Sequence, residues 1–381
     1  MLLSIFNNEY KTAESEVNMI KKLLSILLVL AFILVMPIYA FADESSIDGI
    51  RSLKTEEELI EYATNIFPEH LHALVEVGDL DGYEDYSLGE PFTVFNVVEN
   101  TNSSCFPVLQ NEKIVAILEI SENNGEYNSS LSVSFAKELE DILNSNKMKD
   151  FVLLTDGIHL QAFNGEDSIE IFNLYNDGTE VRELSSKLSL SLSSLYSVLP
   201  KSDLKKELKE DVYLAKSQYP EGPKSYRTLG VRGVSQGGHD WCWAATCAAM
   251  INYKKGKSLS ASDVAKYVFP NNPEQGGTWS AIKKAYNHWG LYPSQTGVIS
   301  FRNVKSDINS NKPMHLGLKR HSVGLIGYED WVGSPDGNNG RILILLEPNG
   351  GVHKSVRLNS YGNFTYKLGG GDNAWQYTRR F

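Results

Sequence analysis

Residues Trp241–Ile251 place apolar side chains on every face of a helix and include no charged residue. A helix of this kind is stable in water only when it is buried on all sides. Two basic residues, Lys254 and Lys255, and then Gly256 follow the run, which is typical of a helix C-terminus. The chain therefore has to build a domain around a central helix that begins close to Cys242.

Charge divides the 381 residues into two halves of opposite sign. Residues 43–224 carry 14 Lys and Arg against 35 Asp and Glu, whereas residues 225–381 carry 19 against 9. The two net charges, −21 and +10, predict mutual attraction, with an accidental asymmetry as the alternative. Proline and glycine at 219–223 cannot continue a helix, so we place a linker with an activation site at 211–225. The total charge of −11 argues against nucleic acid as a partner.

A targeting segment precedes both halves. Lys21 and Lys22 lead into an apolar run over 23–36, Pro37 breaks it, and small residues end it at position 42. This order predicts that residues 1–42 are an upstream extension and a secretory signal, and that the protein is secreted and extracellular. The alternative is an uncleaved membrane anchor at the cell surface, because the run approaches the length that spans a bilayer.

The acidic half, residues 43–210, has the pattern of an α+β module. Apolar side chains of Lys54–Phe67 lie on one stripe and predict a helix that Pro68 ends. Short apolar runs follow, and residues 151–154 and 160–163 predict a hairpin.

The basic half, residues 226–381, has helices first and antiparallel strands afterwards, which predicts an α+β domain with two lobes. After the central helix we expect helices over 260–268 and 278–289. Strands are expected over 314–318, 322–328, 342–346, 352–358 and 364–368.

Cys242 stands in the first turn of the central helix, where unpaired backbone N–H groups favour a reactive thiolate. His321 precedes an apolar strand and is the best placed base. Glu347 and Asn349 follow another strand, and either can orient the imidazole. Cys105 and Cys247 are expected to be buried free thiols. The histidines that rank below His321 are His239, His288, His315 and His353.

The segment from Gln236 to Trp243 resembles the active-site segment of papain-like cysteine peptidases, and the strand led by His321 and ending in Gly327-Tyr328 resembles their histidine strand. The resemblance covers 226–381 and is nearest to the compact bacterial group with staphopain-like and bacteriocin-leader-peptidase-like enzymes. It implies a papain-like fold of a helical lobe and a β lobe, with Gln236 as oxyanion donor and no metal or cofactor. Glu347 matches the third catalytic position by place and Asn349 by residue type, and we favour Glu347.

The resemblance implies a secreted cysteine endopeptidase that cleaves protein or peptide substrates through a thioester. The same thioester permits acyl transfer or deamidation. A catalytically silent secreted binding protein, with Trp241 and Trp243 in its contact surface, is the alternative from another class.

Secreted papain-like peptidases are generally made as zymogens, so the resemblance also implies that residues 43–210 are an inhibitory prodomain. Phe106–Leu109 and Lys113–Leu118 resemble the strand-rich prodomains of staphopain-like or streptopain-like precursors. We expect this half to cover the cleft until the linker is cut.

Overall fold

The computed structural model describes residues 49–123, 125–145, 148–157, 159–173, 199–208, 222–332, 340–365 and 373–381. The signal segment predicted over 1–42 lies outside these ranges, as does most of the linker predicted at 211–225. None of the helices in the described ranges has the length and apolar character needed to cross a membrane. The contacts group Asp48–Phe381 into one compact unit of mixed α+β structure.

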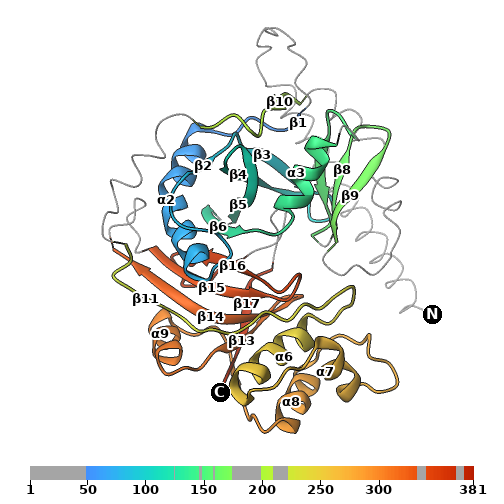
Figure 1. Ribbon diagram of the computed structural model, residues 1–381, viewed down its shortest axis with the longest axis vertical. Helices are drawn as coiled ribbons and strands as arrows, with labels where there is room; N and C mark the ends of the chain where they lie inside the picture. Colours follow the sequence, from blue (N-terminus) through green and yellow to red (C-terminus); the bar gives the residue numbers. More distant parts are fainter. Residues whose placement is uncertain are drawn as a thin grey trace, which may run out of the picture. The chain divides into compact units, whose positions relative to one another are not determined.

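The N-terminal half places a long helix, α2 (Glu57–Glu76), and a short one, α3 (Ala136–Asn144), against a mainly antiparallel sheet (Figure 1). The strands of this half are β1 (Ile50–Arg51), β2 (Tyr86–Leu88), β3 (Phe92–Asn96), β4 (Thr101–Gln110), β5 (Lys113–Asn123), β6 (Glu126–Ser132), β7 (Val152–Thr155), β8 (His159–Phe163), β9 (Ser168–Asn173) and β10 (Lys201–Ser202). The antiparallel pairing of β7 with β8 confirms the predicted hairpin.

Helix α2 runs through Pro68, so the prediction that this proline ends the helix is wrong. Apolar side chains on both sides of it, including Phe67, Leu71 and Leu74, are buried in one core with strands β4 and β5. Each such side chain gains about 1.5–3 kcal/mol on burial. Together they outweigh the cost of about 3 kcal/mol for a proline inside a helix.

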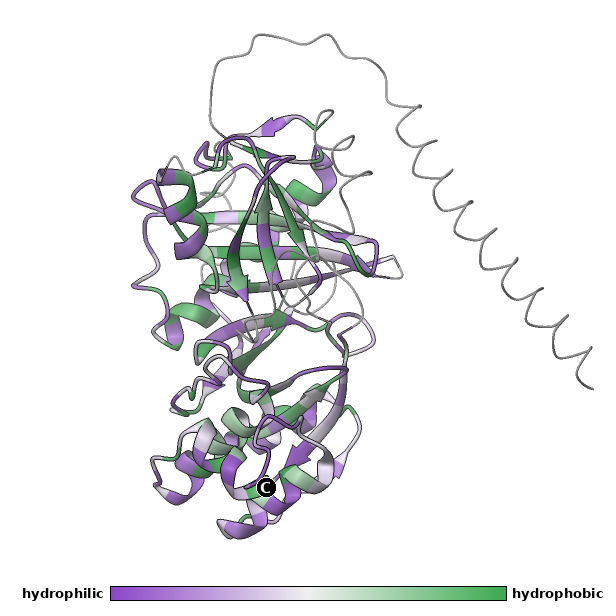
Figure 2. Cartoon of the chain, turned by 90° about the vertical axis from the view of Figure 1, so that its right-hand side faces the viewer, coloured by the Kyte–Doolittle hydropathy of each residue, from purple (hydrophilic) through white to green (hydrophobic). Residues whose placement is uncertain are grey.

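The C-terminal half carries its helices before its long strands, as predicted, but two short strands depart from this order, because β11 precedes α6 and β12 lies between α8 and α9. Its helices are α6 (Cys242–Lys255), α7 (Ala261–Val268), α8 (Trp279–His288) and α9 (Phe301–Asn309). Its strands are β11 (Ser225–Thr228), β12 (Ser294–Thr296), β13 (Met314–Leu318), β14 (Ser322–Trp331), β15 (Gly340–Glu347), β16 (Val352–Arg357) and β17 (Trp375–Arg380). Figure 2 shows hydrophobic residues concentrated along the strands, and α6 is buried in the core of this half.

Helix α9 and strand β17 have no counterpart among the predicted elements. The start of α9 has a recognisable signal, because the side chain of Ser300 accepts a hydrogen bond from the N–H of Asn303. The strand predicted over 364–368 falls partly outside the described residues. In its described part, Thr365 forms a single bridge with Ala374.

One sheet joins the two halves, because strand β16 pairs antiparallel with β6. Fifteen of the described strands form one sheet whose main path is β12-β17-β13-β14-β15-β16-β6-β5-β4-β3-β7-β8-β9, with β11 paired to β14 and β2 paired to β4. Strands β1 and β10 form a separate two-stranded sheet. At the junction Ser355 faces Leu131 across the ladder, and Leu131 is fully buried. The contact between the halves is therefore backbone hydrogen bonding over a buried core.

Helix α2 adds a buried ion pair to this junction. Its Glu69 accepts a hydrogen bond from Arg357 of β16 at 2.8 Å, with side-chain exposures of 0% and 4%. The neighbouring His70 bridges Ser129 and Ser355, at 2.9 Å and 2.8 Å. Burial and the charge of Arg357 lower the pKa of His70 to about 3, so this imidazole is neutral at physiological pH.

Glu69→Ala should strongly destabilise the protein, because it leaves the guanidinium of Arg357 buried without its carboxylate. The expected loss in the free energy of unfolding is about 3–5 kcal/mol, measured by urea denaturation of the full chain. Lys137→Ala is the control, because Lys137 pairs with Asp141 on an exposed face of α3, and its midpoint should stay at the wild-type value. Equal midpoints for the two variants would contradict a role for the buried pair.

Candidate active site

Cys242 is the first residue of helix α6 and is half-buried. The tryptophans on either side of it hold this turn in place. The indole N–H of Trp241 donates to the carbonyl of Pro273 at 2.8 Å, and that of Trp243 donates to Gln275 at 3.2 Å. The sulfur therefore lies at a fixed helix N-terminus, where the first backbone N–H groups have no partner within the helix.

His321 stands immediately before strand β14, and its imidazole contacts the carboxylate of Glu347 at the end of β15. The distance from Nε2 to Oε1 is 2.8 Å, and the two side chains are 2% and 4% exposed. The ion pair is thus almost completely shielded from water. The hydrogen bond on Nε2 leaves Nδ1 as the nitrogen available to the sulfur.

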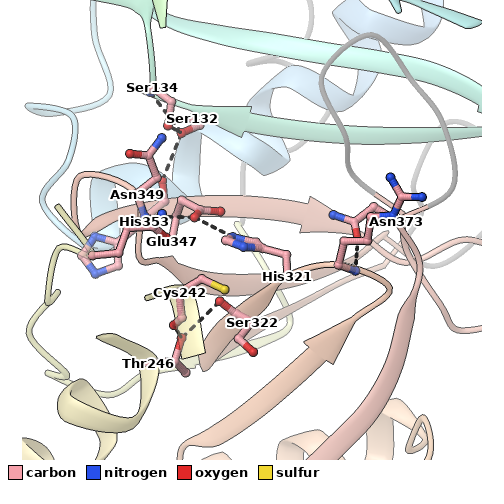
Figure 3. A network of polar contacts seen from close by, with 12 residues as sticks. Ser132, Ser134, Cys242, Thr246, His321, Ser322, Glu347, Asn349, His353 and Asn373 are labelled. Carbon is pink, nitrogen blue, oxygen red and sulfur yellow. Dashed lines mark hydrogen bonds and ion pairs between the residues drawn. The ribbon is translucent and has the colours of Figure 1, made fainter. Parts of the chain in front are cut away.

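Figure 3 shows the Cys242 sulfur pointing toward this imidazole. Burial works against a charged His321, but the charge of Glu347 and a hydrogen bond with Cys242 outweigh it and raise the pKa of His321 to about 10. Burial likewise opposes a charged Glu347, but the imidazolium overcomes this and lowers its pKa to about 2. At neutral pH the site holds an imidazolium between a carboxylate and a sulfur.

Thr246 connects the two elements that carry the cysteine and the histidine. Its hydroxyl is 2.8 Å from the carbonyl oxygen of Cys242 and 3.1 Å from that of Ser322 (Figure 3). Because Thr246 lies one turn into α6 and Ser322 opens β14, this contact sets the helix terminus against the histidine strand.

The two residues proposed for the third position have different places. The side chain of Glu347 reaches His321, whereas Asn349 donates its backbone N–H to Glu347 Oε1 at 3.1 Å. The geometry therefore brings Glu347 to the imidazole and leaves Asn349 as a support for the carboxylate.

Gln236, the expected oxyanion donor, is 1% exposed in the loop before α6. Its backbone N–H donates to the carbonyl of Pro348 at 2.8 Å, and its side-chain Nε2 donates to the carbonyl of His239 at 3.0 Å. The loop is therefore attached to the turn that follows Glu347.

A cavity of about 730 Å³ opens beside Cys242 and His321. Most of its other lining residues come from the glycine-containing segment before α8, from the end of β13 with the turn after it, and from strand β17, and the rest come from the start of α6, from β12 and from β14. They are Asp240, Trp243, Gly276, Gly277, Thr278, Trp279, Gln295, Gly317, Leu318, Lys319, Arg320, Ser322, Gln376, Tyr377 and Arg379. Gly277 is necessary here, because a Cβ at this position would lie 2.1 Å from Cγ of Trp243.

The other cysteines are buried, and the lower-ranked histidines have partners other than Cys242 and Glu347 within the described residues. Cys105 and Cys247 are buried free thiols, as predicted. His315 is buried with its Nδ1 2.8 Å from the Tyr286 hydroxyl, and His353 pairs with Asp79. Nowhere in the described part of the chain do three His, Cys, Asp or Glu side chains gather as a metal site would require.

Comparison with known protein families gives a match in the C-terminal half. Residues 228–372 match the model of the Peptidase_C39 like family, and the match includes Cys242, His321 and Glu347. It supports a cysteine peptidase of the papain-like clan in this part of the chain. No curated protein matches the chain.

Glu347→Gln should lower kcat/KM and move the alkaline limb of its pH profile to lower pH. The carboxylate is the main cause that raises the pKa of His321, so the imidazolium is lost earlier without it. The rates are measured from pH 5 to 11 on a fluorogenic peptide. Asn349→Ala keeps the backbone donor and should preserve the wild-type limb. If the limb moves for Asn349→Ala but not for Glu347→Gln, the roles are exchanged.

Proposed function

We propose that the chain is a secreted cysteine endopeptidase that hydrolyses peptide bonds through a thioester. The observation that carries the proposal is the shielded His321–Glu347 ion pair, which faces a cysteine at a helix N-terminus and borders an open cavity. A structural cysteine needs neither the ion pair nor the cavity. Secretion rests on the signal predicted over residues 1–42.

The chemistry follows from the positions of the proton and the sulfur. The thiolate of Cys242 attacks the peptide carbonyl while His321, protonated at neutral pH, donates its proton to the leaving amine. The developing oxyanion accepts hydrogen bonds from the Cys242 backbone N–H and from the Gln236 amide. Water then hydrolyses the thioester with His321 as base, and Glu347 holds the ring throughout.

Cys242→Ala should abolish cleavage of casein and retain the fold, because it removes the nucleophile and leaves the ion pair intact. We expect a loss of several orders of magnitude in kcat. The control is Cys247→Ala, which changes a buried thiol of the same helix and should retain activity.

An epoxide inhibitor separates this proposal from a silent binding protein, because it should label Cys242 and leave the two buried thiols unmodified. Mass spectrometry of the cleavage products separates hydrolysis from acyl transfer or deamidation. Unchanged casein cleavage by Cys242→Ala would eliminate the assignment.

The inhibitory role of residues 43–210 is a further proposal, supported by their opposite charge and by the sequence resemblance. The residues that line the cavity all lie between Asp240 and Arg379, so no described residue of the N-terminal half is among them. Release of this half would require opening the β6–β16 ladder and breaking the Glu69–Arg357 pair. Cutting the linker and separating the halves are therefore two distinct steps.

Limited proteolysis within 209–221 should give two fragments that elute together in size-exclusion chromatography, because the shared sheet persists after the cut. Casein cleavage before and after the cut measures inhibition. A rise in rate supports the inhibitory role, whereas equal rates mean that the cut alone does not relieve inhibition while the halves remain paired. Fragments that separate without denaturant would contradict the shared sheet.

A further inference from the structure

Arg379 is a buried cation that has no counter-ion among the residues that the structure describes. It lies on strand β17, is 6% exposed and lines the catalytic cavity. Its Nε and Nη1 atoms are buried and have no hydrogen-bond partner within the described ranges. The next residue is different, because Arg380 binds Asp307 with contacts of 2.6 Å and 3.0 Å. Buried charges in proteins are normally paired, so a buried guanidinium that lacks a carboxylate partner needs an explanation.

The surroundings hold the guanidinium in place without neutralising it. Its Cζ lies 5.4 Å from the centre of the Trp279 ring, a cation–π contact. A Cβ on Gly317 would be 3.1 Å from Nη1 and 3.4 Å from Nη2, so the absence of a side chain there makes room for the guanidinium. Trp279, Gly317 and Tyr377 all line the same cavity as Cys242 and His321.

The groups that interact with Arg379 inside the domain are neutral at physiological pH. Burial and the charge of Arg379 keep the pKa of His315 well below its usual value. Burial raises the pKa of Cys247 to about 12 and that of Tyr286 well above 10. None of the three supplies an anion.

The cavity itself is basic. Lys319 and Arg320 line it together with Arg379, and Asp240 is the one acidic residue among its lining residues. The half that forms it has a net charge of +10. A carboxylate entering from the cavity would satisfy the buried guanidinium with charge-assisted hydrogen bonds.

We propose that Arg379 is a specificity-determining residue that binds a carboxylate of the peptide substrate. The carboxylate is either an Asp or Glu side chain near the cleaved bond or the C-terminal carboxylate of a short peptide. This inference rests on the proposed peptidase function and names its substrate class.

The test uses the full chain and fluorogenic peptides in matched pairs. One set carries Glu or Gln at each position around the cleaved bond, and a second set ends in a free acid or an amide. Wild type should prefer Glu over Gln at one position, or acid over amide, by about tenfold or more in kcat/KM. The set that shows the preference identifies the source of the carboxylate.

Arg379→Gln should abolish the preference, because the KM for the acidic peptide rises to that for its neutral partner. Arg379→Lys should keep part of the preference, and Arg379→Met offers an apolar variant if the glutamine is poorly tolerated. Arg302→Gln is the matched control, because Arg302 is exposed on α9 outside the cavity and should retain the full preference.

Equal cleavage of every matched pair by wild type overturns the carboxylate subsite while the peptidase assignment stands. A preference that persists in Arg379→Gln and Arg379→Met assigns it to another residue and also overturns the proposal. If no peptide is cleaved and the epoxide does not label Cys242, the proposed function itself fails, and the substrate class fails with it.

Discussion

The structure of the site depends on one buried ion pair, between His321 and Glu347. Because both side chains are shielded from water, either charge would strongly destabilise the fold without its partner. The pair contributes stability in full between about pH 4.5 and 6.5, the ordinary pKa values of the two groups. This contribution is lost toward pH 10 as His321 deprotonates and toward pH 2 as Glu347 is protonated. The contact that Thr246 makes between α6 and β14 then brings Cys242 to the charged ring.

The N-terminal half is linked to the strand that carries Glu347 through one intervening strand, β16. Glu347 ends β15, β15 pairs with β16, and β16 pairs with β6 of the N-terminal half. The junction is closed by Glu69, His70 and Arg357, all of them buried. The described part of this half is therefore continuous with the sheet that carries Glu347.

The two buried arginines, Arg357 and Arg379, differ in whether a carboxylate neutralises them. Arg357 has a carboxylate at 2.8 Å and belongs to the junction between the halves. Arg379 lies against the Trp279 ring, Gly317 and neutral polar groups, and it lines the cavity. An unpaired guanidinium is costly unless an external anion completes it. For this reason the substrate is the natural counter-ion.

The sequence by itself determined the features that depend on short-range order. The apolar run places Cys242 at a helix start, and strand patterns place His321 and Glu347 at strand ends. Other features needed the tertiary structure: which of Glu347 and Asn349 reaches the imidazole, the pairing of β6 with β16, and the lack of a counter-ion for Arg379. Helix and strand periods repeat within a few residues, whereas pairing across a sheet and the neutralisation of a charge join residues far apart in the chain. Only the folded chain decides which of those distant groups meet.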